Sequence, residues 1–169
     1  FLSFIDKTAM IYSDNNNNLR DIWTGWSEDN ASTFKEGSAV DNNNWQLMSC
    51  PASGPDGVIV NDTLYSTFMS GSGGKTRTYL SKTSLPTHEL VSVKTLTGNL
   101  SGLNQQNYPR LATDGKAIAI VWLQNRSGGD QLPILFTDDI NKGFPLAFDT
   151  VALADIVNAD VAIGNNKVF

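Results

Sequence analysis

Arginine side chains are the first candidates for chemistry in this sequence, because two of them lie where strands are expected to begin. Arg110 follows Pro109 at the start of an expected inner strand, and Arg77 opens an expected middle strand. A planar guanidinium binds a carboxylate through two parallel hydrogen bonds. We therefore consider Arg110, and then Arg77, as ligand contacts, with a loop position or a structural salt bridge as the alternative for Arg110. Arg20 and Arg126 lie in polar loops, where we expect them to be solvated.

Tryptophan offers a second kind of contact. Trp45 follows the asparagine run at residues 42–44, so we expect its ring on a loop where it can stack on a sugar. Trp122 ends an apolar run and is expected to pack between sheets instead.

The other reactive residue types predict no catalytic residue, no cofactor and no metal site. His88 is the one histidine and has no Ser or Cys partner, so we expect a surface residue. Cys50 is the one cysteine, which excludes an intrachain disulfide and favours a small buried side chain. Residues 139–143 faintly resemble a calcium loop, but the terminal bidentate Glu is missing.

Charge and hydropathy restrict the partners. The net charge is -5 and no Lys/Arg cluster is present, which argues against nucleic acid and against an anionic membrane surface. No apolar run approaches the roughly 18 residues of a membrane span. Hydrophobic residues make up 40% of the chain, enough for a folded core.

The elements that must position these residues follow from an internal repeat of about 54 residues. Pro55 and Pro109, Phe68 and Trp122, and Ser27 and Ser81 are each 54 apart. A fixed period of this length predicts a repeat architecture. Short β-branched and aromatic runs, bounded by Gly, Asn, Asp and Ser, predict strands at residues 10–13, 21–26, 57–60, 63–69, 76–81, 90–95, 117–123, 132–137 and 150–153.

About four strands in each copy predict an all-β fold, a β-propeller of four-stranded blades. We expect one partial propeller over residues 1–169, with blades at about 1–50, 51–98 and 99–154 and the start of a fourth at 155–169. Three blades and a stub leave two sheet faces open. Either the chain is a piece of a longer propeller or copies of it self-associate through those faces.

Residues 27–34 resemble the Asp-box of sialidases and related BNR-repeat proteins, Ser/Thr-x-Asp-x-Gly-x-Thr-Trp/Phe. Ser27, Asp29, Thr33 and Phe34 match, whereas Ala31 stands where Gly is usual. Residues 50–55 and 108–115 resemble further segments of the same proteins. The resemblance implies a sialidase-like propeller, with the Asp-box as a structural hairpin between the third and fourth strands of a blade.

The resemblance also implies a carbohydrate-related function. Sialidases bind their substrate through three arginines, the first in a Phe/Tyr-Arg-Ile-Pro phrase that this chain lacks. We therefore expect a glycan-binding module without complete catalytic machinery, bacterial and extracellular or periplasmic. Two alternatives stay open: a fragment of an active sialidase-like glycoside hydrolase, and a propeller that binds proteins.

Overall fold

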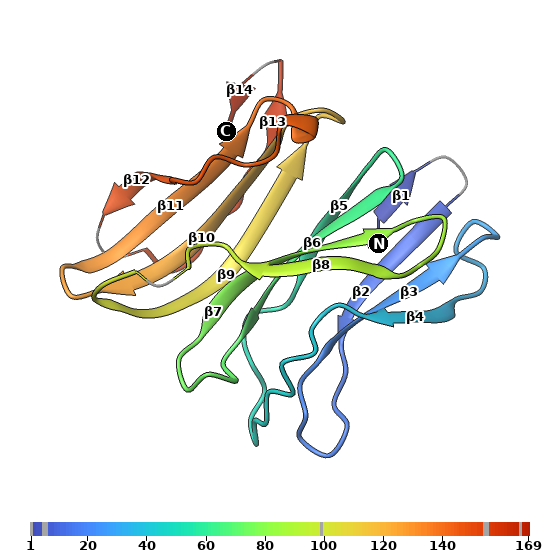
Figure 1. Cartoon of the computed structure of the whole chain (residues 1–169), viewed down its shortest axis with the longest axis horizontal. Helices are drawn as coiled ribbons and strands as arrows, with labels where there is room; N and C mark the ends of the chain where they lie inside the picture. Colours follow the sequence, from blue (N-terminus) through green and yellow to red (C-terminus); the bar gives the residue numbers. More distant parts are fainter. Residues whose placement is uncertain (1, 5–6, 99, 154–155, 166) are drawn as a thin grey trace.

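Antiparallel strands make up nearly all the regular structure of the chain (Figure 1). The computed structural model describes residues 2–4, 7–98, 100–153, 156–165 and 167–169. Within them the first sheet runs in the order β1 (Leu2–Phe4), β2 (Lys7–Ser13), β3 (Ile22–Ser27) and β4 (Lys35–Ala39). The second runs β5 (Asp56–Val60), β6 (Thr63–Ser70), β7 (Arg77–Ser84) and β8 (Leu90–Thr95).

The third sheet has the same order of strands along the chain. It contains β9 (Leu103–Thr113), β10 (Ile118–Arg126), β11 (Gly129–Thr137) and β12 (Asp149–Leu153). A 3₁₀ turn, η1 (Ile140–Lys142), joins its last two strands, and the short strands β13 (Ile163–Gly164) and β14 (Lys167–Val168) pair near the C-terminus. The predicted all-β fold of four-stranded blades is confirmed.

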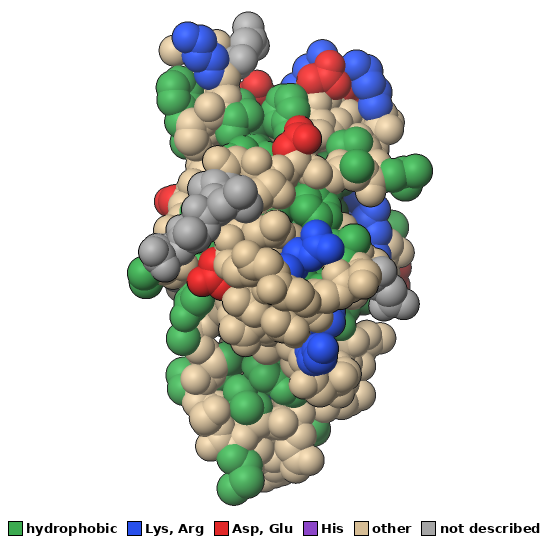
Figure 2. Space-filling model, turned by 90° about the vertical axis from the view of Figure 1, so that its left-hand side faces the viewer, with side chains coloured by type: hydrophobic (Ala, Val, Ile, Leu, Met, Phe, Trp, Pro, Cys, Tyr) green, Lys and Arg blue, Asp and Glu red, His purple; other side chains and the backbone are tan. Residues whose placement is uncertain are grey.

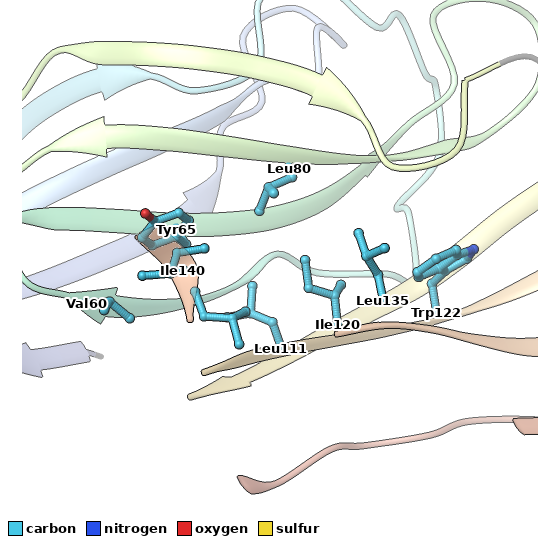
Figure 3. Packing of buried hydrophobic residues seen from close by; sticks show 9 residues of the cluster. Val60, Tyr65, Leu80, Leu111, Ile120, Trp122, Leu135 and Ile140 are labelled. Carbon is cyan, nitrogen blue, oxygen red and sulfur yellow. The ribbon is translucent and has the colours of Figure 1, made fainter. Parts of the chain in front are cut away.

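Successive blades pack face to face, because apolar residues of one strand face alternate with polar ones. The core between the second and third blades places Val60, Tyr65 and Leu80 against Leu111, Ile120, Trp122, Leu135 and Ile140 (Figure 3). Trp122 is fully buried there, as its apolar strand predicted. Ala9, Trp26, Leu64 and Leu85 form part of the core between the first two blades.

First strands of neighbouring blades lie side by side, since β5 contacts both β1 and β9. The N-terminal strand of each blade is therefore the inner strand, the position where sequence analysis placed Arg110. The predicted strands do not include β4, the first half of β9, or the short strands β1, β13 and β14. Strand β4 and the first half of β9 are rich in polar residues, so the apolar run that marks the other strands is absent.

Expected blade boundaries at residues 99 and 154–155 lie outside the described residues. In the described part, no helix is both long and apolar enough to cross a membrane.

Candidate functional site

The Asp-box residues form a hydrogen-bonded hairpin between β3 and β4. The Asp29 carboxylate accepts hydrogen bonds from the Thr33 backbone N–H (2.8 Å), the Thr33 hydroxyl (2.6 Å) and the Ser27 hydroxyl (2.7 Å). The Ser27 oxygen accepts in turn from the Ala31 N–H (2.8 Å). These bonds, with the Thr33 hydroxyl first, lower the pKa of Asp29 to about 2. The carboxylate is thus occupied in holding its own turn.

The equivalent turns of the other blades differ. In the third blade Thr137 ends β11, and Asp139 caps η1 by accepting from the Asn141 N–H (2.9 Å). Capping holds the pKa of Asp139 below its usual value. In the second blade Ser81 lies inside β7, so the turn begins later, at Ser84. The repeat of 54 residues therefore aligns strands better than turns.

His88 and Cys50 contradict their sequence-based predictions. His88, expected at the surface, is half-buried and stacks on Trp26 with ring centroids 4.6 Å apart. Cys50, expected in the core, is exposed. Both lie in connections between strands, where no sequence periodicity determines which side chains are covered.

Arg77 joins two blades. Its guanidinium donates to the backbone carbonyls of Thr76 (2.7 Å), Asn104 (3.2 Å) and Leu103 (3.5 Å), and the last two belong to β9. With these donors already engaged, Arg77 acts as an inter-blade link, although it also lines a depression with Lys75.

Trp45 lies in the connection between the first and second blades. Its indole packs over Gly71, so closely that a Cβ at Gly71 would clash with the ring. The Trp45 carbonyl accepts from the Arg20 N–H (2.8 Å). The ring is half-buried in this contact.

A strained bulge lies in the inner strand β9. Val121 pairs with Arg110 and Leu123 pairs with Asn107, so Tyr108 and Pro109 together oppose Trp122. Tyr108 has a φ of 51°, a left-handed conformation that is a genuine outlier for a bulky side chain. Ser53 holds the bulge by accepting from the Tyr108 N–H (2.9 Å). Such bulges re-aim side chains and are frequent beside active sites.

The bulge lies in the wall of a polar crevice. One depression, of about 160 Å³, lies between this strand and Ile156–Val157. A second, more open one follows, with Arg110 on one side and Asn158, Ala159 and Asp160 on the other. We call the two together the β9 crevice; its polar side chains are Gln105, Asn107, Tyr108, Arg110, Gln124, Asn125, Asp130, Asn158 and Asp160.

Arg110 retains free donors in the β9 crevice. Among the described residues its guanidinium has one hydrogen-bond partner, the Pro109 carbonyl (2.8 Å), and no carboxylate within ion-pair distance. Asn125 is less free, because it donates to Asp130 (2.7 Å) and accepts from Asn104 (2.8 Å). The crevice thus presents a half-buried cation among amides, hydroxyl and carboxylates, the groups that bind polyhydroxylated or acidic ligands.

The three predicted ligand residues do not converge. Arg110 lines the β9 crevice, Arg77 lines a different depression, and Trp45 packs on a loop glycine. Sequence reasoning missed Tyr108 and Asn107, although the repeat of Pro55 at Pro109 pointed to this part of the inner strand. Nothing local in the sequence indicated the left-handed conformation of Tyr108.

Among the described residues, no group of three or more His, Cys, Asp or Glu side chains is arranged to hold a metal ion.

Comparison with known proteins supports the fold. No family model matches this sequence, and no curated protein matches it. A solved structure, the Penicillium chrysogenum α-L-arabinanase complexed with arabinobiose, is similar over 94% of this chain with a TM-score of 0.58 and 11% identity. The match covers 50% of that protein, so this chain spans about half its length. The likeness shows a β-propeller fold and does not single out the sialidase-like family.

Proposed function

We propose that this chain is part of a carbohydrate-related β-propeller and binds a glycan in the β9 crevice. The observation that carries the proposal is the strained Tyr108 bulge, which lies in the crevice wall beside a guanidinium with free donors. A bulky residue at positive φ costs on the order of 1–3 kcal/mol, and such strain clusters at binding sites. The similar arabinanase was solved in complex with arabinobiose, which supports a sugar ligand.

The glycan class depends on what the Arg110 guanidinium meets. A sugar acid such as a sialoside would take two parallel hydrogen bonds from the guanidinium, as the Asp-box resemblance implies. A neutral arabino-oligosaccharide would instead use the amides of Gln105 and Asn107 together with single guanidinium bonds. We propose the acidic glycan first, because Arg110 lacks a carboxylate partner among the described residues.

Complete catalytic machinery is not part of the proposal. Asp130 and Asp160 are the crevice carboxylates, and Asp130 is engaged by Asn125. Glycoside hydrolysis needs a placed acid and a second carboxylate on either side of the scissile bond. The second candidate is therefore that this chain belongs to a larger glycoside hydrolase, which the arabinanase likeness favours.

Glycan binding can be measured by calorimetry with sialyllactose and with arabinobiose, after a glycan array. Replacing Arg110 by Ala should weaken sialyllactose binding at least tenfold, because the charged donors are lost. Arg126→Ala is the matched control, since that arginine bonds the Ser101 carbonyl on a loop. Trp45→Ala should leave the affinity within about twofold, because Trp45 lines neither part of the crevice.

The result also decides between the candidates. Binding that survives Arg110→Ala, or no binding to any glycan, would exclude the β9 crevice as a glycan site. Turnover of an arabinoside or sialoside by the chain itself would replace the binding module with the hydrolase.

A further inference from the structure

Two aspartates lie at one end of the first blade, apart from the β9 crevice. Asp21 precedes β3 and Asp41 closely follows β4. The N–H groups of Val40 (2.8 Å) and Asp41 (3.3 Å) both donate to the Ile22 carbonyl, which holds the two strand ends together. Asp41 is 0% exposed, yet no described Lys, Arg or His forms an ion pair with it.

Several oxygens in this cluster are buried without a hydrogen-bond partner. Asp41 Oδ1 accepts from the Asn43 backbone N–H (2.9 Å) and the Asn43 side-chain amide (2.6 Å), but Asp41 Oδ2 has no partner. Asp21 Oδ1 and the Ser70 hydroxyl are also buried without a hydrogen-bond partner. A buried polar group left in this way costs about 1–3 kcal/mol, and more when it is charged.

Ser70 provides a second, independent observation at this place, because it belongs to the second blade. It ends β6, is 1% exposed, and lies beside the Asp41 carboxylate without the geometry of a full hydrogen bond. Its free hydroxyl oxygen and the free oxygen of Asp41 thus meet at the joint between two blades. Such a pair of oxygens from separate blades is what a ligand with positive charge would fill.

The carboxyl groups at this end of the blade lie close enough to affect each other's pKa. Burial first, and then repulsion from neighbouring carboxylates, raises the pKa of both groups: Asp21 acts on Asp41, and Asp14 acts on Asp21. Backbone N–H groups of Asn43 and Asn44 oppose the effect. A water molecule could donate to the free carboxylate oxygens but would not neutralise their charge.

We propose that Asp21, Asp41 and Ser70 bind a hard divalent cation, of the calcium class, which fastens the first blade to the second. The donors are oxygens only, which suits Ca²⁺ or Mg²⁺ and not a transition metal that prefers nitrogen or sulfur. Calcium is favoured over magnesium because it accepts an irregular set of six to eight oxygens. Three protein side chains leave the remaining positions to water and to the side-chain oxygens of residues 42–44.

Terbium luminescence and thermal unfolding test the site on chelator-treated protein at pH 7. We expect Tb³⁺ emission, sensitised by nearby aromatic rings, that Ca²⁺ displaces, and a rise in Tm when Ca²⁺ is added. Asp41→Asn should weaken Ca²⁺ binding at least tenfold and abolish the rise in Tm. Asp62→Asn, at an exposed turn, is the matched control and should leave both signals unchanged.

Ser70→Ala provides a milder second variant should Asp41→Asn fold poorly, and it should weaken Ca²⁺ binding while circular dichroism stays unchanged. Absence of Ca²⁺ binding by the native chain at millimolar concentration would overturn the proposal. So would a Ca²⁺ response that Asp41→Asn and Ser70→Ala both retain. If the native chain does not bind Ca²⁺, a higher stability of Asp41→Asn would show that Asp41 is a neutral buried acid.

Discussion

At the scale of single residues, aspartates with similar polar neighbours in the sequence differ in burial and in pKa. Asp29 is exposed and satisfied by its own turn, whereas Asp41 is buried and has one oxygen without a partner. The pKa of Asp29 is lowered to about 2 and that of Asp41 is raised. Burial is the main cause of the raised pKa of Asp41, whereas hydrogen bonds from Thr33 and Ser27 are the main cause of the lowered pKa of Asp29.

Acid unfolding tests the role of Asp29. Its pKa is lowered on folding, so its contribution to stability is present above the unfolded pKa of about 4 and is lost as the pH falls towards 2. Asp29→Asn should lower the urea midpoint at pH 7 and remove part of the decline between pH 4 and 2. Urea unfolding at pH 7, 4 and 2.5 measures both effects; parallel pH profiles for the two proteins would contradict the assignment.

At the scale of elements, β9 combines an irregular backbone with a regular sheet. The Tyr108–Pro109 bulge interrupts its pairing with β10, and Asp56 Oδ2 accepts from the Leu111 N–H (3.0 Å) just beyond. With Ser53 on the other side, residues leading into the second blade hold the bulge in the third. The shape of the crevice therefore depends on contacts between two blades.

Two substitutions at Tyr108 isolate the backbone strain, because both remove the ring. Asn tolerates a left-handed conformation and β-branched Val does not, so Tyr108→Val should be less stable than Tyr108→Asn by about 1–2 kcal/mol. Guanidinium unfolding gives the difference. The same two changes at Ser92, exposed in β8, should order the other way, since Val favours strands. Equal stability of the two Tyr108 variants would show that the bulge is unstrained.

At the scale of the whole molecule, the outer face of the third blade exposes apolar side chains. Leu135 of β11 points into the core, so its neighbour Phe136 points away from the second blade, where it is 41% exposed. Figure 2 shows hydrophobic side chains interspersed with polar ones on this side of the molecule. Ile163 and Val168 lie near Phe136 across a depression.

We expect copies of this chain to associate through such faces. Light scattering should give a mass that rises with concentration towards twice that of one chain. Phe136→Asp should shift the rise to higher concentration, because burial of the charge opposes association. Met48→Asp, on a loop, should leave it unchanged. A constant mass of one chain at all concentrations would contradict self-association through these faces.

The amino-acid sequence by itself determined most of the strands and their grouping by four. Alternation of apolar and polar residues is a local property, and it predicted Leu90–Thr95 to the residue. It also placed Phe68 and Trp122, 54 residues apart, in the buried second strands of two blades. The polar strand Lys35–Ala39 was missed because pairing with β3, and not its own pattern, makes it a strand.

Only the tertiary structure decided which side chains meet. Arg77, Trp45 and Arg110 were all predicted to contact a ligand, yet each contacts a different neighbour. Ser70 lies beside Asp41 across two blades, a contact between residues that share no local pattern. Such contacts depend on how blades pack and twist against each other. The sequence of a single strand does not determine that packing.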